Sequence, residues 1–340
     1  MPSLNFPSAT GPVQGTTARS PWSIRRTSSI DTCWPDGPGT SMYMTGHSRD
    51  LLTSATTASP QVLAEDRFTA RLTPEREIIT ISSNPPRPAT AELGGSRAGS
   101  QLRSAIARTL GDELASGTPL YLLLDDIAGA SLVAHWGAMQ WAPEPESAGE
   151  LVEPRVESML GVCWGFSPDS PVIKGEPGGR QSHHRKVAPL DATPDTWAWH
   201  VLPEQHGPAA RRARRIDVHF AGDLILAETH FQDSAPLHDG TRLAVHEYLV
   251  QLTIDRQTHV IQSITADPRI LPFGYCPGAV HNIGLLVGTK VGALRQTVID
   301  LFAKTAGCTH LNDTMRSLAE VPQLSAALAA AIQFDAQSRI

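Results

Sequence analysis

The residues most able to do chemistry stand in a short string near the C-terminus. Residues 307–313 read Gly-Cys-Thr-His-Leu-Asn-Asp and lead into apolar residues at helical spacing, so a thiol and an imidazole meet at a predicted helix start. We expect Thr309 to cap that helix. Because the free N–H groups of a helix start favour an anion, the string predicts a lowered pKa for Cys308, whose thiolate would bind a metal or attack an electrophile.

Two further residues can complete a metal site with this string. Cys276 lies in a Pro- and Gly-rich turn before another predicted helix, and His246 begins a strand on its more apolar face. Cysteine and histidine are ligands that zinc and iron–sulfur clusters prefer. The sequence therefore predicts a zinc or iron–sulfur site built from Cys276, Cys308, His310 and His246. In an enzyme the first three would bind the metal and leave a position open for water or substrate, whereas in a structural or carrier site His246 would be the fourth ligand.

Two alternatives to a metal site stay open. In a metal-free enzyme, Cys308 would be the nucleophile and a histidine its base. In a structural or interaction protein, the cysteines and histidines would be ordinary core residues, and Trp164, Trp197 and Trp199 would mark a docking surface. The sequence has no phosphate-binding glycine loop and no nucleophile elbow, so no nucleotide cofactor is expected.

Other polar clusters are predicted to have ordinary roles. The arginine-rich run at residues 211–215 lies beside a linker and is expected to be a solvated face. His183 and His184 fall in linker sequence and are not expected to act in catalysis. Asp125 and Asp126 follow an apolar run that we predict as a strand, where adjacent side chains point to opposite faces, so they are not expected to share a cation.

Composition excludes several classes of protein. The 340 residues are 41% hydrophobic and 18% charged, which is enough to bury a sizeable core. The net charge of −6 argues against a nucleic-acid partner, and no apolar run is long enough to cross a membrane. The first thirty residues lack the apolar core of a secretory signal, so we expect a cytoplasmic protein with free cysteines. A small-molecule ligand is the expected partner, and the oligomeric state stays open.

The sequence contains a weak internal repeat, with corresponding segments roughly 180 to 190 residues apart. The matching segments are residues 25–31 with 212–217, 66–81 with 246–261, and 102–107 with 294–299. The candidate residues His246, Cys308 and His310 correspond in this alignment to Asp66, Thr118 and Leu120. Folding alone therefore does not require the candidate residues, which favours a chemical role for them.

These patterns predict an α+β fold of two pseudo-repeated units, each an antiparallel β-sheet covered by α-helices, packed against one another. In the second unit we expect strands at residues 245–254 and 260–266, and helices that begin near residues 294 and 309. The predicted divisions are a mobile tail at 1–20, a first unit with a degenerate site at 21–141, a Pro- and Gly-rich linker with docked pieces at 142–207, and a second unit carrying the site at 208–340.

Several of these segments resemble the bacterial DUF2889 family, whose members have no settled function. The resemblance rests on residues 25–31 and 49–51, on the pattern His-x-Tyr-x-Val-x-Leu-Thr-x-Asp at residues 246–255, and on Gly-Cys-Thr-His-Leu at residues 307–311. It covers nearly the whole chain except the tail and parts of the linker. The family implies no activity, so the sequence predicts an uncharacterised metal-binding protein, with a metalloenzyme acting on a small molecule as one form of it.

The second unit is also distantly similar to NifU-like iron–sulfur cluster scaffold proteins. The similarity lies in the order of hairpin, cysteine-bearing turn, helices and cysteine-bearing string. It implies Cys276 and Cys308 as ligands, His310 as a partner from the helix, and His246 or His238 from the hairpin region. The additional hairpin cysteine of those proteins is absent here, which favours a mononuclear metal or a plain thiol site over a cluster.

Overall fold

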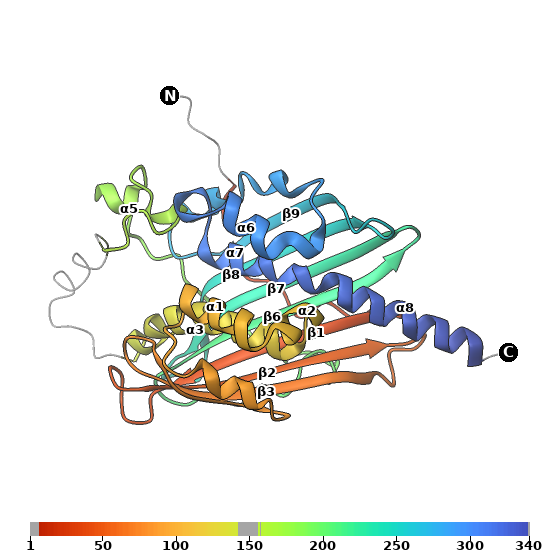
Figure 1. Cartoon of the computed structure of the whole chain (residues 1–340). Helices are drawn as coiled ribbons and strands as arrows, with labels where there is room; N and C mark the ends of the chain where they lie inside the picture. The colour runs from red at the N-terminus through yellow and green to blue at the C-terminus, as the bar shows by residue number, and fades with distance from the viewer. Residues whose placement is uncertain (1–6, 142–155, 157, 339–340) are drawn as a thin grey trace.

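One antiparallel β-sheet runs through the whole molecule (Figure 1). The computed structural model describes residues 7–141, 156 and 158–338, and within them the sheet has nine strands. Their order is β4-β3-β2-β1-β6-β7-β8-β5, and β9 shares an edge of β8 with β5. Helices cover one face of this sheet (Figure 1). The predicted mixed α and β class is therefore confirmed.

The sheet consists of two meanders joined through their first strands. The strands are β1 (Ser23–Cys33), β2 (Met42–Thr53), β3 (Gln61–Leu72), β4 (Ile78–Asn84), β5 (Arg185–Val187), β6 (Ala209–Ala221), β7 (Leu224–Pro236), β8 (Arg242–Asp255) and β9 (Ile261–Ile270). Strands β1 and β6 pair along their full length, with Ser23 opposite His219 and Cys33 opposite Ala209. The sequence predicted one sheet in each of two units packed against one another, and in the structure these two sheets are continuous edge to edge.

The longest helix crosses the junction between the two meanders. The helices are α1 (Ser100–Thr109), α2 (Gly111–Ser116), α3 (Pro119–Met139), α5 (Pro171–Lys174), α6 (Leu294–Leu301), α7 (Thr309–Ser317) and α8 (Val321–Ser338). Helix α3 begins where the Thr118 side chain accepts a hydrogen bond from the Tyr121 N–H, with Pro119 in its first turn. It packs on strands of both meanders. Predicting a strand before Asp125 was wrong, because a helix buried on most sides has no apolar periodicity to distinguish it from a buried strand.

The arginines of residues 211–215 lie at the centre of the sheet, so the prediction of a solvated face was wrong. Strand β6 pairs on both edges, and all four arginines are buried. Each one faces a carboxylate: Arg211 pairs with Asp31, Arg212 with Asp233, Arg214 with Asp126, and Arg215 with Asp217 and Glu228. Burial of four cations is possible here because every one has an acidic partner, on a strand of the sheet or, for Arg214, on helix α3.

The other face of the sheet carries parts of the predicted tail and linker. The Thr10 N–H donates to the Pro268 carbonyl at 3.0 Å, and Arg19 pairs with Asp195 at 2.7 Å. Trp199 is buried there, whereas Trp164 stacks on Tyr275 at a ring separation of 5.6 Å. Part of the predicted linker, residues 142–155 and 157, lies outside the described residues. Within the described ranges, none of the helices has the length and apolar character that crossing a membrane requires.

Candidate metal centre

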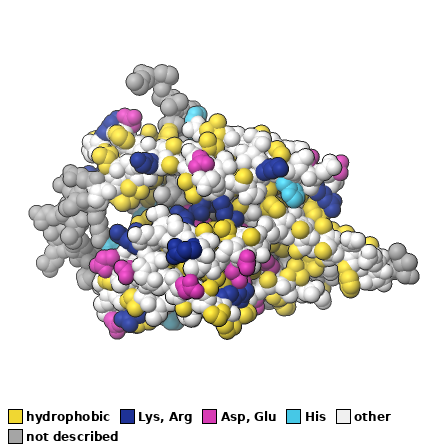
Figure 2. Space-filling view, viewed as in Figure 1, with side chains coloured by type: hydrophobic (Ala, Val, Ile, Leu, Met, Phe, Trp, Pro, Cys, Tyr) yellow, Lys and Arg dark blue, Asp and Glu magenta, His cyan; other side chains and the backbone are white. Residues whose placement is uncertain are grey.

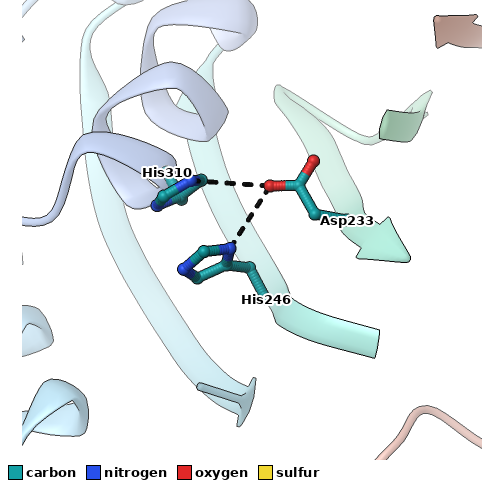
Figure 3. Close-up of side chains that lie close together, drawn as sticks. All are labelled: Asp233, His246 and His310. Atoms are coloured by element: carbon teal, nitrogen blue, oxygen red, sulfur yellow. Dashed lines mark ion pairs between the residues drawn. The ribbon is translucent and has the colours of Figure 1, made fainter. Parts of the chain in front are cut away.

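Two side chains from neighbouring strands and one from helix α7 converge on one point (Figure 3). Asp233 on β7 lies opposite His246 on β8, and α7 brings His310 over these strands. One ligand atom from each residue lies within 4.8 Å of the others. In the part of the chain that the structure describes, this is the one group of three histidine, cysteine or acidic residues with that geometry.

Both imidazoles lie close to the same carboxylate oxygen (Figure 3). His246 Nδ1 lies 3.4 Å and His310 Nε2 3.6 Å from Asp233 Oδ2. These separations exceed the normal length of a hydrogen bond, and His246 Nδ1 has no hydrogen-bond partner among the described residues. The two rings stack with their centroids 3.4 Å apart and their planes at 17°. The cluster is therefore compact, but its polar atoms are not satisfied by hydrogen bonds within it.

Burial and charge set the protonation states of the three groups. Burial lowers the pKa of His246, and burial together with the neighbouring His246 holds the pKa of His310 well below its ordinary value. Burial alone would raise the pKa of Asp233, but Arg212 and the two histidines hold it below its usual range. At neutral pH the site therefore presents two neutral imidazoles and one carboxylate, which are the protonation states that a metal ion needs.

Arg212 fixes the carboxylate from the opposite side. Its Nε donates to Asp233 Oδ1 at 2.8 Å and its Nη2 to Oδ2 at 3.0 Å, while Nη1 donates to Asp313 Oδ2 at 2.9 Å. A carboxylate has about four lone-pair sites, so Oδ2 can still accept from the side of the histidines. Gly129 of α3 makes room for this arrangement, because a Cβ there would lie 1.8 Å from Arg212 Nη1.

Cys308 lies beside the cluster but on the far side of His310. Its sulfur is 3.9 Å from His310 Nδ1, whereas Asp233 faces Nε2 of the same ring. Cys308, and not Thr309, is the N-cap residue of α7, and its side chain makes no capping hydrogen bond. Burial raises the pKa of Cys308 and outweighs the lowering by the backbone N–H groups of His310 and Leu311. The predicted lowering of this pKa and the predicted cap were therefore wrong.

Cys276 is buried on the same side of the sheet, near the half-buried Cys163. A Cβ on Gly165 would be 2.7 Å from the sulfur of Cys276 and 3.9 Å from that of Cys163. Burial raises the pKa of Cys276, and raises that of Cys163 to about 12. The structure thus brings together two of the four predicted ligands, His246 and His310, and places neither cysteine in their three-residue group. Metal binding by any of the four stays a prediction.

Sequence analysis did not identify two residues near the centre as candidates: it did not name Asp233, and it set His184 aside as part of the linker. Asp233 lies opposite Arg212 in the β6–β7 register, so correct pairing of those strands would have identified it. His184 precedes β5, which pairs with β8 just before His246. Burial and the nearby His246 lower the pKa of His184 to about 4, and its ring packs edge-on against Trp136 at 5.1 Å. No pattern in the linker sequence indicates that position.

Comparison with known proteins bears on the second half of the sheet. No curated protein matches the chain, and no solved structure matches it. The similarity to NifU-like scaffold proteins therefore stays a prediction. Residues 210–323, about a third of the chain, match the model of a family described as Protein of unknown function (DUF2889). In this stretch, which contains Asp233, His246, Cys276, Cys308 and His310, the chain is similar to the DUF2889 family.

Proposed function

We propose that the protein binds one divalent metal ion, zinc or iron(II), through Asp233, His246 and His310. The observation that carries this proposal is the spacing of the ligand atoms, at 3.4 and 3.6 Å around one carboxylate oxygen. Ligands at 2.0–2.2 Å from a tetrahedral zinc lie about 3.3–3.6 Å from one another. The same distances are too long for hydrogen bonds, so a metal ion accounts for them better than a hydrogen-bonded network does.

The groups behind the ligands also fit a metal ion. His310 Nδ1 lies 3.3 Å from Thr309 Oγ1, which leaves Nε2 free toward Asp233. Arg212 holds Asp233, so the carboxylate is oriented before a metal arrives. Such outer partners orient metal ligands in many sites. The lone pairs of imidazole lie in the ring plane, so coordination would tilt the stacked rings away from their 17° arrangement.

This ligand set favours a catalytic site over a structural one. Structural zinc sites use four protein ligands, whereas catalytic zinc keeps three and leaves a position for water or substrate. Two histidines and one carboxylate are also the ligands of non-haem iron(II) enzymes. Oxygen and nitrogen donors do not suit an iron–sulfur cluster, which is held mainly by thiolates. We infer a mononuclear centre that polarises or activates a small molecule, with a metal-bound water as the simplest reagent.

Metal titration tests this proposal. Protein stripped with EDTA should bind one equivalent of zinc or cobalt(II) by calorimetry, and His246→Ala and His310→Ala should each weaken binding by at least about a hundredfold, more than the loss of a typical outer partner. His206→Ala is the matched control, because that side chain is 78% exposed and pairs only with Glu204 among the described residues. Absence of binding to the wild type would reject the proposal. A thiolate-to-cobalt charge-transfer band would instead indicate ligation by cysteine.

A metal-free nucleophile is the second candidate. Cys308, His310 and Asp233 form a line in which the thiol faces one ring nitrogen and the carboxylate faces the other. That order is the one used by cysteine nucleophiles with a histidine base and an orienting third group. Alkylation by iodoacetamide, followed residue by residue with mass spectrometry, tests it. A nucleophilic Cys308 would react faster than the exposed Cys33 in metal-free protein, whereas a buried, inert thiol would react more slowly.

We also infer that the two meanders arose by internal duplication. Supporting this, Arg25 pairs with Asp217 and Arg211 with Asp31, in both cases through Nε and Oδ1 at 2.6 Å. These two ion pairs exchange places when residue 25 is matched with 211 and residue 31 with 217. The weak internal repeat in the sequence and the two equivalent ion pairs between β1 and β6 both support a duplication.

A further inference from the structure

A cavity of about 260 Å³ opens on the helix-covered face, where the helices of the two halves meet. Its walls come from the turn between β3 and β4 and from α1, α3, α6 and α7. Figure 2 shows basic side chains gathered in a hollow at the middle of this face. The volume lies just below the range of about 300–1,000 Å³ that small-molecule sites usually have. It is large enough for a small organic ligand.

The charges that line this cavity are mainly positive. Arg76, Arg103 and Arg316 line it, and Asp313 is the one acidic residue among its lining residues. Arg103 Nε and Arg316 Nη2 are held by Asp125 at 3.0 and 2.9 Å, so both guanidinium groups are fixed. Arginines held in place in this way lose little freedom when they bind an anion.

Arg76 has no acidic partner among the described residues. Burial and the neighbouring Arg97 both lower the pKa of Arg76. Its backbone has a φ of 68°, a conformation that residues other than glycine seldom adopt. Two hydrogen bonds hold it, from the Arg76 N–H to the Thr73 carbonyl at 2.9 Å and from the Ala98 N–H to the Arg76 carbonyl at 2.8 Å. An unpaired, half-buried guanidinium on a strained turn calls for an anion that the described residues do not supply.

The rest of the lining is apolar. Ala128 and Leu132 of α3 form one wall, and Ile299 of α6 with Ala303 forms another. Leu132 and Ile299 are 40% and 43% exposed, so apolar surface of both side chains is left for a ligand to cover. Inorganic phosphate would leave these walls uncovered, whereas an organic anion would cover them and gain from the burial of apolar surface.

We propose that this cavity binds a small organic carboxylate. Its carboxylate group would pair with Arg76 and Arg103, whose planar guanidinium groups match a carboxylate with two parallel hydrogen bonds. Its aliphatic or aromatic body would lie against Leu132 and Ile299. This proposal goes beyond the metal centre and does not depend on it, because none of the three candidate metal ligands lines the cavity.

Ion pairs nevertheless connect the cavity with the candidate centre. Asp313, which lines the cavity, contacts Arg103 at 3.3 Å and Arg212 at 2.9 Å, and Arg212 in turn holds Asp233. A carboxylate that binds Arg103 would share that arginine with Asp313. If binding of a carboxylate changes the affinity for metal by some factor, binding of the metal must change the affinity for the carboxylate by the same factor.

Binding measurements on EDTA-treated protein test the proposal independently of the metal. Benzoate, butyrate and inorganic phosphate are titrated at constant ionic strength and followed by calorimetry or by NMR shifts. The variant Arg76→Asn removes the unpaired charge and suits a positive φ, and Arg97→Asn is the matched control, because Arg97 is exposed and outside the cavity. A second variant, Leu132→Asp, places a repelling carboxylate at the mouth without disturbing a buried position.

The expected result is that benzoate or butyrate binds the wild type and Arg97→Asn alike. Arg76→Asn and Leu132→Asp should each weaken this binding at least about tenfold, as expected for the loss of a charge-assisted hydrogen bond or the gain of a like charge. The proposal is overturned if neither carboxylate binds, if phosphate binds as tightly as both, or if Arg97→Asn weakens binding as much as Arg76→Asn. Because the protein carries no metal in these titrations, either result leaves the test of the centre unaffected.

Discussion

The two halves of the sheet contain the same buried ion pair but differ in what surrounds it. Arg26 lies opposite Asp50 in the β1–β2 register, and Arg212 lies opposite Asp233 in the β6–β7 register. In both halves the arginine Nε binds Oδ1 of the aspartate, at 2.6 and 2.8 Å. A register shift follows the aspartate in both halves, between residues 50 and 51 and between residues 233 and 234. The ion pair therefore belongs to the architecture of the sheet.

The two halves differ in the residue that the next strand places opposite this aspartate. Asp50 lies opposite Ala64, whereas Asp233 lies opposite His246. The strand register thus matches Ala64, and not Asp66 as the sequence alignment had it, with His246. Arg26 forms a second ion pair with Glu320 at 3.2 Å. Arg212 instead forms its second ion pair with Asp313, in the helix that also carries His310. The Arg–Asp pair is thus common to both halves, whereas the two histidines lie beside it only in the second.

Removal of either aspartate should produce the largest effect. Asp233→Ala and Asp50→Ala each leave a buried arginine without its main partner, and breaking such a pair costs about 3–5 kcal/mol. We expect the two free energies of unfolding, measured in urea, to fall by similar amounts, within about 1 kcal/mol of each other. If Asp233→Ala were nearly neutral while Asp50→Ala was severe, the pair in the second half would not be part of the architecture.

Gly129→Ala should have the next largest effect on stability. It acts on the ion pair of the second half alone. The added Cβ would lie 1.8 Å from Arg212 Nη1 and 2.6 Å from Asp313 Oδ2, so this ion pair must move. Overpacking of this kind costs about 1–3 kcal/mol. Gly111→Ala is the control, since a Cβ there meets nothing within 4 Å. Thermal unfolding should show a lower Tm for Gly129→Ala only, and equal Tm values would mean that Arg212 moves without cost.

A smaller effect is expected when the added histidine is removed. The first half has alanine at the level of His246, so His246→Ala should lower the free energy of unfolding of the metal-free protein by only about 1 kcal/mol. Zinc at a hundred times its dissociation constant should stabilise the wild type by about 2.7 kcal/mol and leave the variant unchanged. A zinc-induced rise in Tm that persists in His246→Ala would place the ion elsewhere.

Sequence patterns predicted the parts of the fold that alternate or repeat. The alternating patterns at residues 245–254 and 260–266 correctly predicted the strands now seen as β8 and β9. The apolar stripes at residues 294–302 and from 309 onward correctly indicated α6 and α7. The same periodicity failed where both faces of an element are covered. Burial of Arg212 and Arg214 depends on acids from β7 and α3, and nothing local in the sequence shows which carboxylate each arginine meets.

The sequence predicted only part of the candidate centre, for a related reason. His246 and His310 stood out because each begins a recognisable element, while Asp233 has meaning only through strand register. The cysteines had been chosen for their chemical type, and burial in apolar surroundings raises their pKa values, which a sequence without coordinates does not reveal. Local strings thus identified candidate residues, and tertiary pairing decided which of them meet.

A histidine on the other face of the sheet, His200, is expected to make the stability of the protein depend on pH. His200 lies against β1, with Nε2 and Nδ1 each 2.8 Å from the hydroxyls of Ser29 and Thr27, and its ring contacts His47. Burial holds the pKa of His200 well below its ordinary value. The stability that the neutral ring provides is therefore complete above about pH 6.5 and decreases as the pH falls below it, by at most about 1.4 kcal/mol per pH unit.

Replacement of this histidine separates its contribution from that of the other buried imidazoles. In His200→Gln the side chain can still bind one hydroxyl but cannot take up a proton, so the free energy of unfolding should vary less between pH 7 and pH 5 than in the wild type. Urea titrations at three pH values measure that slope. An unchanged slope would assign the acid sensitivity to other imidazoles whose pKa values are also lowered, such as His47, His246 and His310.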